Sequence, residues 1–286
     1  MKGTSSIMFA ACGLGHYCGR IMRLPIAGLL LLGLLSVPPP AQAGAPVPSK
    51  VLAEAEELTY NVRYAFFDLG QIRLKILKRV STPAYVAYSA KAYIDSYPKI
   101  PFVDLHATFE SLVDSTVFSR HFIGKVRDKD WWDYARYTFE YDQNRIITEV
   151  GHRDTTIEKQ DTLMINSVYQ DGLSLFYFAR EQVLSGKRMN VPTIVKEKKV
   201  NTYIDFHKTR SSVEIDALDY PVDVVSFDGT LDFIGLFGLT GDFEGWFSND
   251  EARVPILAKM KVILGSITIE LMSWKRAGWT PPRGEG

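Results

Sequence analysis

Cysteine is almost absent from this chain. Its 286 residues contain two cysteines, Cys12 and Cys18, and both precede residue 44. From residue 44 onward, disulfides, thiol redox chemistry, a cysteine nucleophile and a lipid-attachment cysteine are therefore excluded. The stability of that part must come from its core.

Acidic residues are missing from the first 43 positions, which carry only three lysines and arginines. An apolar block at residues 24–37 precedes three prolines, and Ala41, Gln42 and Ala43 follow. The block is shorter than the roughly 20 apolar residues of a membrane-spanning helix, and the last three residues fit a signal peptidase site. We predict a signal peptide over residues 1–43, export to the periplasm, and no transmembrane anchor after processing. Met22 is an alternative start, because it gives an n-region of ordinary length.

A basic surface is also missing. Removing the three basic residues of the signal peptide from 33 leaves 30, against 33 acidic residues, so the mature charge is −3. This balance provides no positive field for nucleic acid, which we exclude as a partner.

Catalytic and metal-binding motifs are lacking as well. His106, His121, His152 and His207 do not form a two-histidine metal motif, and only His152 with Asp154 suggests even a weak metal pair. There is no nucleophile elbow, phosphate-binding loop or dinucleotide fingerprint. We predict no catalytic residue, no metal and no cofactor, and regard an enzyme as the less favoured class.

Alternation of apolar and polar residues is the dominant pattern from residue 58 onward. It predicts strands at 58–64, 72–76 and 85–94, a turn at 68–70, and a hairpin formed by 134–140 and 146–150. Further strands are expected at the ranges 105–113, 121–126, 191–195, 202–207, 212–215, 223–227, 242–247, 254–262 and 267–274. Roughly a dozen strands without repeated helical crossovers predict a mainly β fold, a large curved antiparallel sheet or partly open β-barrel.

Residues 163–169 and 173–184 interrupt this alternation with three- and four-residue spacing. Asp171 can cap a helix and Gly186 can end it. Because the second segment is apolar nearly all round, we predict one buried central helix there. We place the single β-rich domain at 57–276, with a flexible leader at 44–56 and a disordered tail at 277–286.

Two aromatic segments stand out. Trp131 and Trp132 are expected in a turn, folded over the barrel end or facing sugars or lipid headgroups. Residues 246–255 form a corner in which Arg253 could clamp a carboxylate across the hairpin.

Four features together are distinctive: the opening strand with Gly70, the helix with Leu173, Tyr177 and Arg180, the 246–255 corner, and Gly265 before the last strand. In these features the chain resembles the exported bacterial proteins grouped as domain of unknown function 3108. This resemblance implies a β-rich envelope protein, and it carries no catalytic set.

Three functions stay open. The first is a periplasmic module that binds or carries a lipid or other hydrophobic ligand. Tyr177 and Arg180 would line or gate its site, Trp246 would form a wall, and Arg253 would be a further ligand-binding residue. The second is a structural or protein-interaction component of the cell envelope, which meets a partner through an edge strand or the Trp131 turn. The third is a cell-envelope hydrolase. Core packing with an internal ion pair is the alternative role of Tyr177, Arg180 and Trp246, and a buried Arg180 then requires a carboxylate partner.

Overall fold

A computed structural model describes residues 49–100, 103–153, 156–234, 239–262 and 265–285. All of these belong to one compact unit, Gly44–Gly286. The predicted signal peptide lies outside the described residues.

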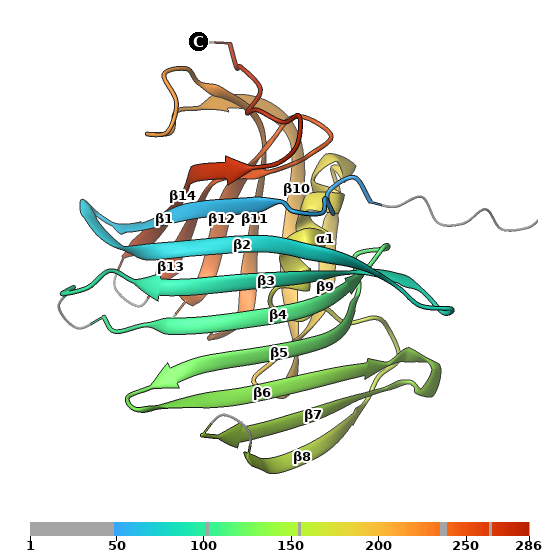
Figure 1. Ribbon diagram of the computed structural model, residues 1–286. Coiled ribbons are helices and arrows are strands. Elements are labelled where there is room, and N and C mark those ends of the chain that lie inside the picture. Colours follow the sequence, from blue (N-terminus) through green and yellow to red (C-terminus); the bar gives the residue numbers. More distant parts are fainter. Residues whose placement is uncertain (1–48, 101–102, 154–155, 235–238, 263–264, 286) are drawn as a thin grey trace, which may run out of the picture. The chain divides into compact units, whose positions relative to one another are not determined.

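In the described residues, fourteen strands form one antiparallel sheet around a short helix (Figure 1). The strands are β1 Glu57–Tyr64, β2 Phe67–Ser81, β3 Val86–Ser96, β4 His106–Asp114, β5 Ser119–Asp128, β6 Trp131–Glu140, β7 Arg145–His152, β8 Thr156–Met164, β9 Arg188–Val195, β10 Lys198–Val213, β11 Val222–Ile234, β12 Leu239–Ser248, β13 Pro255–Val262 and β14 Ser266–Lys275. The helices are η1 Tyr141–Gln143, α1 Ser174–Gln182 and η2 Val183–Ser185. The predicted fold class is confirmed.

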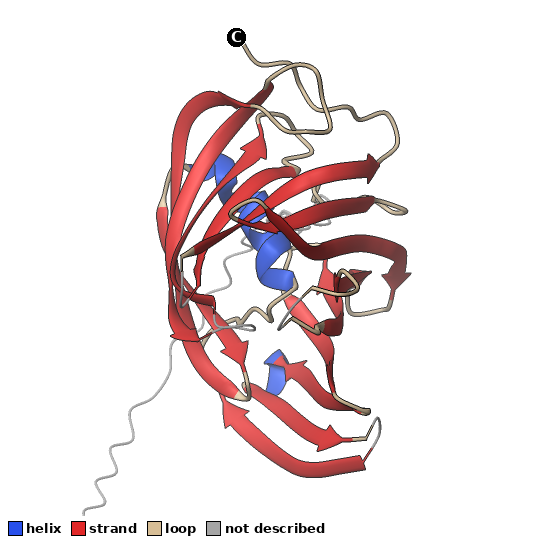
Figure 2. Cartoon of the chain, turned by 90° about the vertical axis from the view of Figure 1, so that its left-hand side faces the viewer, coloured by secondary structure: helices blue, strands red, loops and turns tan. Residues whose placement is uncertain are grey.

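The strand order gives the sheet two halves. Strands β1 to β8 follow one another outward from β1, strands β14 to β9 do so on the other side, and β1 pairs with β14 where the halves meet. In Figure 1 the strands of the two halves run in strongly different directions, and Figure 2 shows the sheet curving around α1. Within the described residues the edge strands β8 and β9 do not pair with each other, so the sheet is not closed.

The segment between β8 and α1 links the two edges instead. The Gln170 amide donates to the Pro192 carbonyl (2.9 Å), and the Ile194 amide donates to the Gln170 carbonyl (2.8 Å). Of residues 163–169, Leu163 and Met164 are the end of β8 and pair with β7, and an irregular connection follows them. The pairing of β8 with β7 therefore overrides the three- and four-residue spacing of this segment.

The predicted strands are found, except that the ranges 202–207 and 212–215 belong mainly to one strand, β10, and that β8 was not predicted. The strand ends also differ at two turns. Tyr64 pairs with Phe67, so the chain turns at Ala65 and Phe66, and the predicted turn at 68–70 lies inside β2. Trp131 and Trp132, expected in a turn, begin β6 and pair with β5. In both places strand pairing extends further along the chain than the alternation indicates.

The cap of α1 explains where the helix begins. Asp171 is fully buried, and its Oδ1 accepts hydrogen bonds from the amides of Leu173 (2.7 Å) and Ser174 (2.8 Å). The Ser174 hydroxyl in turn accepts from the Asp171 amide (2.9 Å), the reciprocal pattern of a capping box. After η2, Gly186 ends the helical segment in the left-handed conformation (φ 63°). Both predicted helix limits are confirmed.

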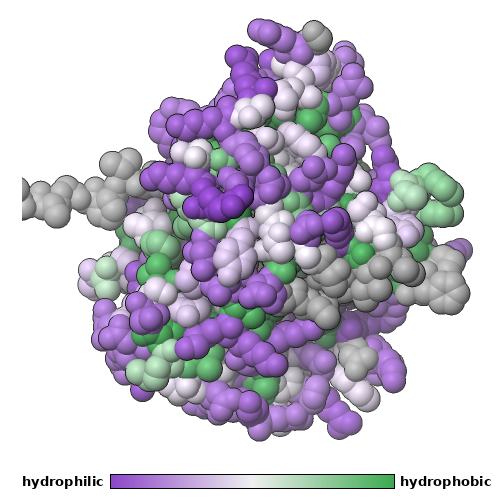
Figure 3. Space-filling model, turned by 180° about the vertical axis from the view of Figure 1, so that it is seen from behind, coloured by the Kyte–Doolittle hydropathy of each residue, from purple (hydrophilic) through white to green (hydrophobic). Residues whose placement is uncertain are grey.

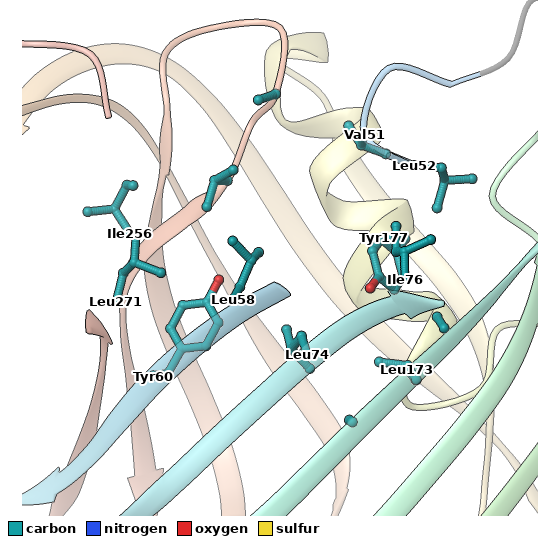
Figure 4. Packing of buried hydrophobic residues seen from close by; sticks show 14 of the residues in the cluster. Val51, Leu52, Leu58, Tyr60, Leu74, Ile76, Leu173, Tyr177, Ile256 and Leu271 are labelled. Carbon is teal, nitrogen blue, oxygen red and sulfur yellow. The ribbon is translucent and has the colours of Figure 1, made fainter. Parts of the chain in front are cut away.

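The main hydrophobic core joins the sheet, α1 and the residues before β1. Figure 4 shows Leu58, Tyr60 and Leu74 of the sheet together with Tyr177 of α1 in this cluster. Val51 and Leu52 belong to the same cluster and are 0% and 5% exposed. The predicted flexible leader is thus wrong for residues 49–56, because two apolar side chains of this segment complete the core.

The predicted disordered tail is also wrong for residues 277–285. Trp279 packs edge-on against Trp274 (5.9 Å between ring centroids), and its indole N–H donates to Asp250 (2.7 Å). The Asp223 amide donates to the Pro282 carbonyl (2.9 Å). The tail therefore continues the pairing of β11 and holds the 246–255 corner.

Candidate ligand cavity

A cavity of about 770 Å³ lies between the two halves of the sheet and α1. Its walls are mainly apolar and come from both halves and the helix. Lining residues that are only partly buried include Ile72, Ile94, Phe109, Val126, Phe176, Phe227 and Phe243. The protein therefore leaves part of an apolar surface uncovered inside its own fold.

Strand register places these side chains on one face. Gly124 of β5 pairs with Phe109 of β4 and with Ala135 of β6, and Ala135 pairs with Val150 of β7. All four residues line the cavity. Because directly paired residues point to the same side of a sheet, one row of the N-terminal half forms a continuous wall.

Aromatic rings and glycines form the opposite wall. Phe227 of β11 pairs with Gly245, and Gly229 pairs with Phe243. A Cβ atom at Gly245 would lie 2.5 Å from the Phe227 ring, and one at Gly229 would lie 2.4 Å from the Phe243 ring. Each ring lies over the glycine opposite, so glycine makes room for the aromatic lining.

One side of α1 closes the cavity. Leu175, Phe176 and Ala179 line it, together with Leu173 at the start of the helix. Tyr177 and Arg180, by contrast, are fully buried and do not line it. The helix is apolar nearly all round because one of its sides packs in the core and another lines the cavity.

A buried charge network fixes the other side of the helix. Arg180 donates to both oxygens of Glu56 (2.6 and 3.1 Å) and to the carbonyls of Ala252 (2.9 Å) and Arg253 (3.1 Å). Arg276 also pairs with Glu56. Burial by itself raises the pKa of Glu56, but the charges and hydrogen bonds of Arg180 and Arg276 outweigh it and lower that pKa. Glu56 is the carboxylate that a buried Arg180 requires.

The four site residues expected from the sequence do not line the cavity. Tyr177 lies under the Arg180 guanidinium (5.6 Å from Cζ to the ring centroid), in the core. Trp246 lies on the opposite face of β12 from Gly245, where the Lys259 ammonium stands 5.3 Å from its ring. Arg253 pairs with Glu181 of α1 (3.4 Å) and not across its own hairpin. Tyr177, Arg180 and Arg253 are brought together, whereas Trp246 is elsewhere.

Sequence reasoning missed the cavity residues themselves, such as Phe109, Ala135 and Phe227. Alternation identified their strands and could assign residues of one strand to one face. It could not tell a face that lines a cavity from one that packs in the core.

Polar groups also line parts of the cavity wall. His152 contacts the Asp133 carboxylate through Nδ1 and lies 3.6 Å from Glu158 through Nε2. The Tyr137 hydroxyl donates to Glu197 (3.1 Å) in the β9–β10 turn. Burial, with the nearby Glu197 charge, raises the pKa of Tyr137. Asp154, the other half of the suggested pair with His152, lies outside the described residues.

The described part of the chain lacks two features that would point to other functions. No cluster of three or more His, Cys, Asp or Glu side chains there could hold a metal ion. No helix there has both the length and the apolar character needed to cross a membrane.

Comparison with known proteins agrees with this architecture. The family model described as protein of unknown function (DUF3108) matches residues 59–272. The chain belongs to the DUF3108 family. A search of curated proteins gave no match.

A solved structure shares the fold of this DUF3108 protein. It is a crystal structure of a beta-barrel-like protein of domain of unknown function DUF1849 from Brucella abortus, with a TM-score of 0.52 and 11% identity. The similarity covers 79% of this chain and 98% of that one. At this identity the likeness concerns the fold alone.

Proposed function

We propose that this protein binds one apolar ligand of the acyl-lipid type in the cavity between its curved sheet and α1. The supporting observation is a cavity of about 770 Å³ whose wall includes partly buried Ile, Phe and Val side chains from both halves of the sheet. Ligand sites in proteins commonly measure roughly 300–1,000 Å³ and are mainly apolar. A cavity of roughly 150 Å³ already accommodates benzene, so this one has room for a much longer hydrocarbon.

The distribution of polar groups favours a lipid with one polar end. Asp133, His152 and Glu158 line one part of the wall, whereas Leu173, Phe176 and Ala179 of α1 line another. An acyl chain against the helix and a polar end beside the first group would match each environment. The face of the molecule that Figure 3 shows is mainly hydrophilic, and its apolar patches are separated from one another.

A fluorescent fatty acid is the probe that tests this proposal. Ala135→Trp places a large ring in the cavity wall, where it displaces part of the ligand. Loss of about two buried methylene groups costs about 1.6 kcal/mol, so the dissociation constant should rise about tenfold or more. Thr138→Trp is the matched control, because Thr138 lies on the opposite face of the same strand. Equal binding by the two variants, or no saturable binding by the parent protein, would reject the proposal.

We also propose that the chain is exported to the periplasm and that its signal peptide is removed before Gly44. The support is the basic, acid-free N-terminus with its short apolar block and Ala41-Gln42-Ala43 site. Mass spectrometry of the periplasmic protein should give a chain that begins at Gly44. A chain that retains residues 24–43 would contradict this.

A second candidate is an interaction component of the cell envelope that pairs through β8. In the described part of the chain this strand pairs with β7 alone, and most of its residues are exposed. Its Glu158, Lys159 and Asp161 weaken this candidate, since charged side chains on an edge strand discourage further pairing. Crosslinking from β8 in cells that recovers a specific partner would favour it.

A further inference from the structure

The tip of the β1–β2 hairpin exposes two aromatic side chains. Phe66 is 80% exposed and Phe67 is 57% exposed, and their rings lie 4.3 Å apart between centroids. The turn is tight, because Tyr64 pairs directly with Phe67 and Ala65 takes a left-handed conformation (φ 50°). The same hairpin thus buries the Tyr60 side chain and leaves the side chains of Phe66 and Phe67 exposed to water.

This tip continues the face that lines the cavity. Tyr60 and Ile72 are register partners and both line the cavity. Tyr60, Val62 and Tyr64 alternate onto the same side of β1, and Phe67 is the partner of Tyr64. An apolar row therefore leads along one hairpin from the cavity wall to the exposed tip.

A third aromatic residue lies at the same end of the N-terminal half. Trp131, at the start of β6, is 36% exposed, and the Arg153 guanidinium stands 5.2 Å from its ring. The β1–β2 and β5–β6 turns occupy the same end because the intervening strands are antiparallel, as Figure 1 shows. The end of the half-sheet, and not one turn alone, therefore presents aromatic side chains.

We propose that this end of the sheet docks on a lipid bilayer, with Phe66 and Phe67 inserted at the level of the headgroups. The inference rests on the proposed function, because an acyl lipid bound in the cavity must come from a membrane or go to one. Phe side chains, like Trp and Leu, bury in the boundary between headgroups and acyl chains when a protein segment lies on a membrane. The apolar row from Phe67 to Tyr60 gives the lipid chain a path that avoids water.

The size and charge of the tip favour a bilayer over a protein partner. Two phenylalanine rings offer roughly 150–250 Å² each, which is well below the roughly 800 Å² that each partner buries in a stable protein interface. Insertion of the two rings into a bilayer, in contrast, does not need a partner surface of complementary shape. Charges around this end are of both signs, with Asp68 and Asp104 exposed beside Lys129. Binding should therefore depend on apolar insertion and persist at high salt.

Vesicle flotation of the mature protein tests the proposal. Phosphatidylcholine vesicles, with and without phosphatidylglycerol, should carry the parent protein to the top of a density gradient. Phe66→Ser with Phe67→Ser should lower the partition coefficient about tenfold or more, because two apolar side chains no longer leave water. The control, Leu77→Ser with Met164→Ser, changes residues that are 49% and 62% exposed away from the tip and should float like the parent. Equal flotation of the tip variant, or an equal loss in the control, would overturn the proposal.

A fluorescent fatty acid without vesicles separates this proposal from the proposed function. The tip variant should bind the probe with the same affinity as the parent. A parent protein that binds the probe and does not float refutes the docking proposal alone. One that floats through Phe66 and Phe67 and binds no probe refutes the cavity function and supports docking. A dimer that depends on these two residues, with no flotation, would assign the tip to a second copy of the chain and overturn the bilayer proposal.

Discussion

Removing the Arg180 side chain should be one of the most damaging single changes outside the cavity. Arg180 is fully buried and makes four hydrogen bonds, two to Glu56 and two to backbone carbonyls of the 246–255 corner. It thereby joins α1 to the segment before β1 and to the corner after β12. In Arg180→Met the side chain keeps much of its volume and loses all four donors.

The loss of unfolding free energy in Arg180→Met follows from the buried groups that lose their hydrogen-bond partner. Glu56 is 2% exposed and would retain Arg276 alone, while the carbonyls of Ala252 and Arg253 would lose their donor. Removing one partner of a buried ion pair costs about 3–5 kcal/mol. A further Glu56→Gln change removes the stranded charge, so the double variant should be less destabilised than the sum of the single variants, by about 0.5–3 kcal/mol.

Urea unfolding of the mature protein measures these differences from the transition midpoints, provided that the m value is unchanged. Arg188→Met is the control, because Arg188 pairs with Asp205 at the surface and its side chain is 80% exposed. The control should stay within about 1 kcal/mol of the parent. A loss of less than about 1 kcal/mol for Arg180→Met, or full additivity with Glu56→Gln, would refute the reasoning.

Two further predictions concern pH and the helix cap. Because the pKa of Glu56 in the folded protein is below its ordinary value of 4.5, this group stabilises the fold above about pH 4.5 and loses that effect as the pH falls through the folded pKa. Glu56→Gln should therefore differ most from the parent near neutral pH, and a constant difference in unfolding free energy from pH 7 to pH 3 would be contrary evidence. Asp171→Ala removes the acceptor of the Leu173 and Ser174 amides and should cost about 1–3 kcal/mol, whereas Asp171→Asn keeps a capping oxygen and should cost less. Burial raises the pKa of Asp171 above 3.8, so its contribution to stability falls as the pH rises from 3.8 through the folded pKa, and Asp171→Asn should gain on the parent over that range. Thermal unfolding across pH checks both statements, and equal losses for the two Asp171 variants would show that the cap does not depend on this oxygen.

Local patterns in the sequence predicted the elements well where the deciding interactions are local. The hairpin of β6 and β7 shows two-residue alternation around a polar turn, and Asn144 in that turn takes the left-handed conformation that such residues tolerate. The α1 segment is bounded by Asp171 and Gly186, which act through neighbours within a few residues. These signals are contained in short stretches of chain.

Features that depend on distant contacts could not be predicted in the same way. Glu56 and Arg180 are 124 positions apart, so nothing near Glu56 indicates that its segment is fixed in the core. The same holds for Trp279, which reaches Asp250 from a stretch rich in proline and glycine. The need of a buried Arg180 for a carboxylate could be argued from its apolar helix, but the partner could not.

The candidate site was missed for a different physical reason. Tyr177 and Arg180 were expected beside a ligand because a tyrosine and an arginine on an apolar helix are chemically distinctive. The structure places both in the core, and the cavity is lined by residues such as Phe109 and Ala135 that look ordinary in the sequence. Whether such a face is filled by the protein depends on the curvature of the whole sheet, which no short segment encodes.

Native mass spectrometry with lipid extraction is the most direct test of the central claim, that the cavity holds an apolar ligand. The protein should be purified from its own host, beside the Ala135→Trp and Thr138→Trp variants. The account predicts a bound lipid at near one to one for the parent and for Thr138→Trp, and a much reduced share for Ala135→Trp. A ligand-free mass for the parent protein, with no saturable binding of the fatty-acid probe, would contradict it.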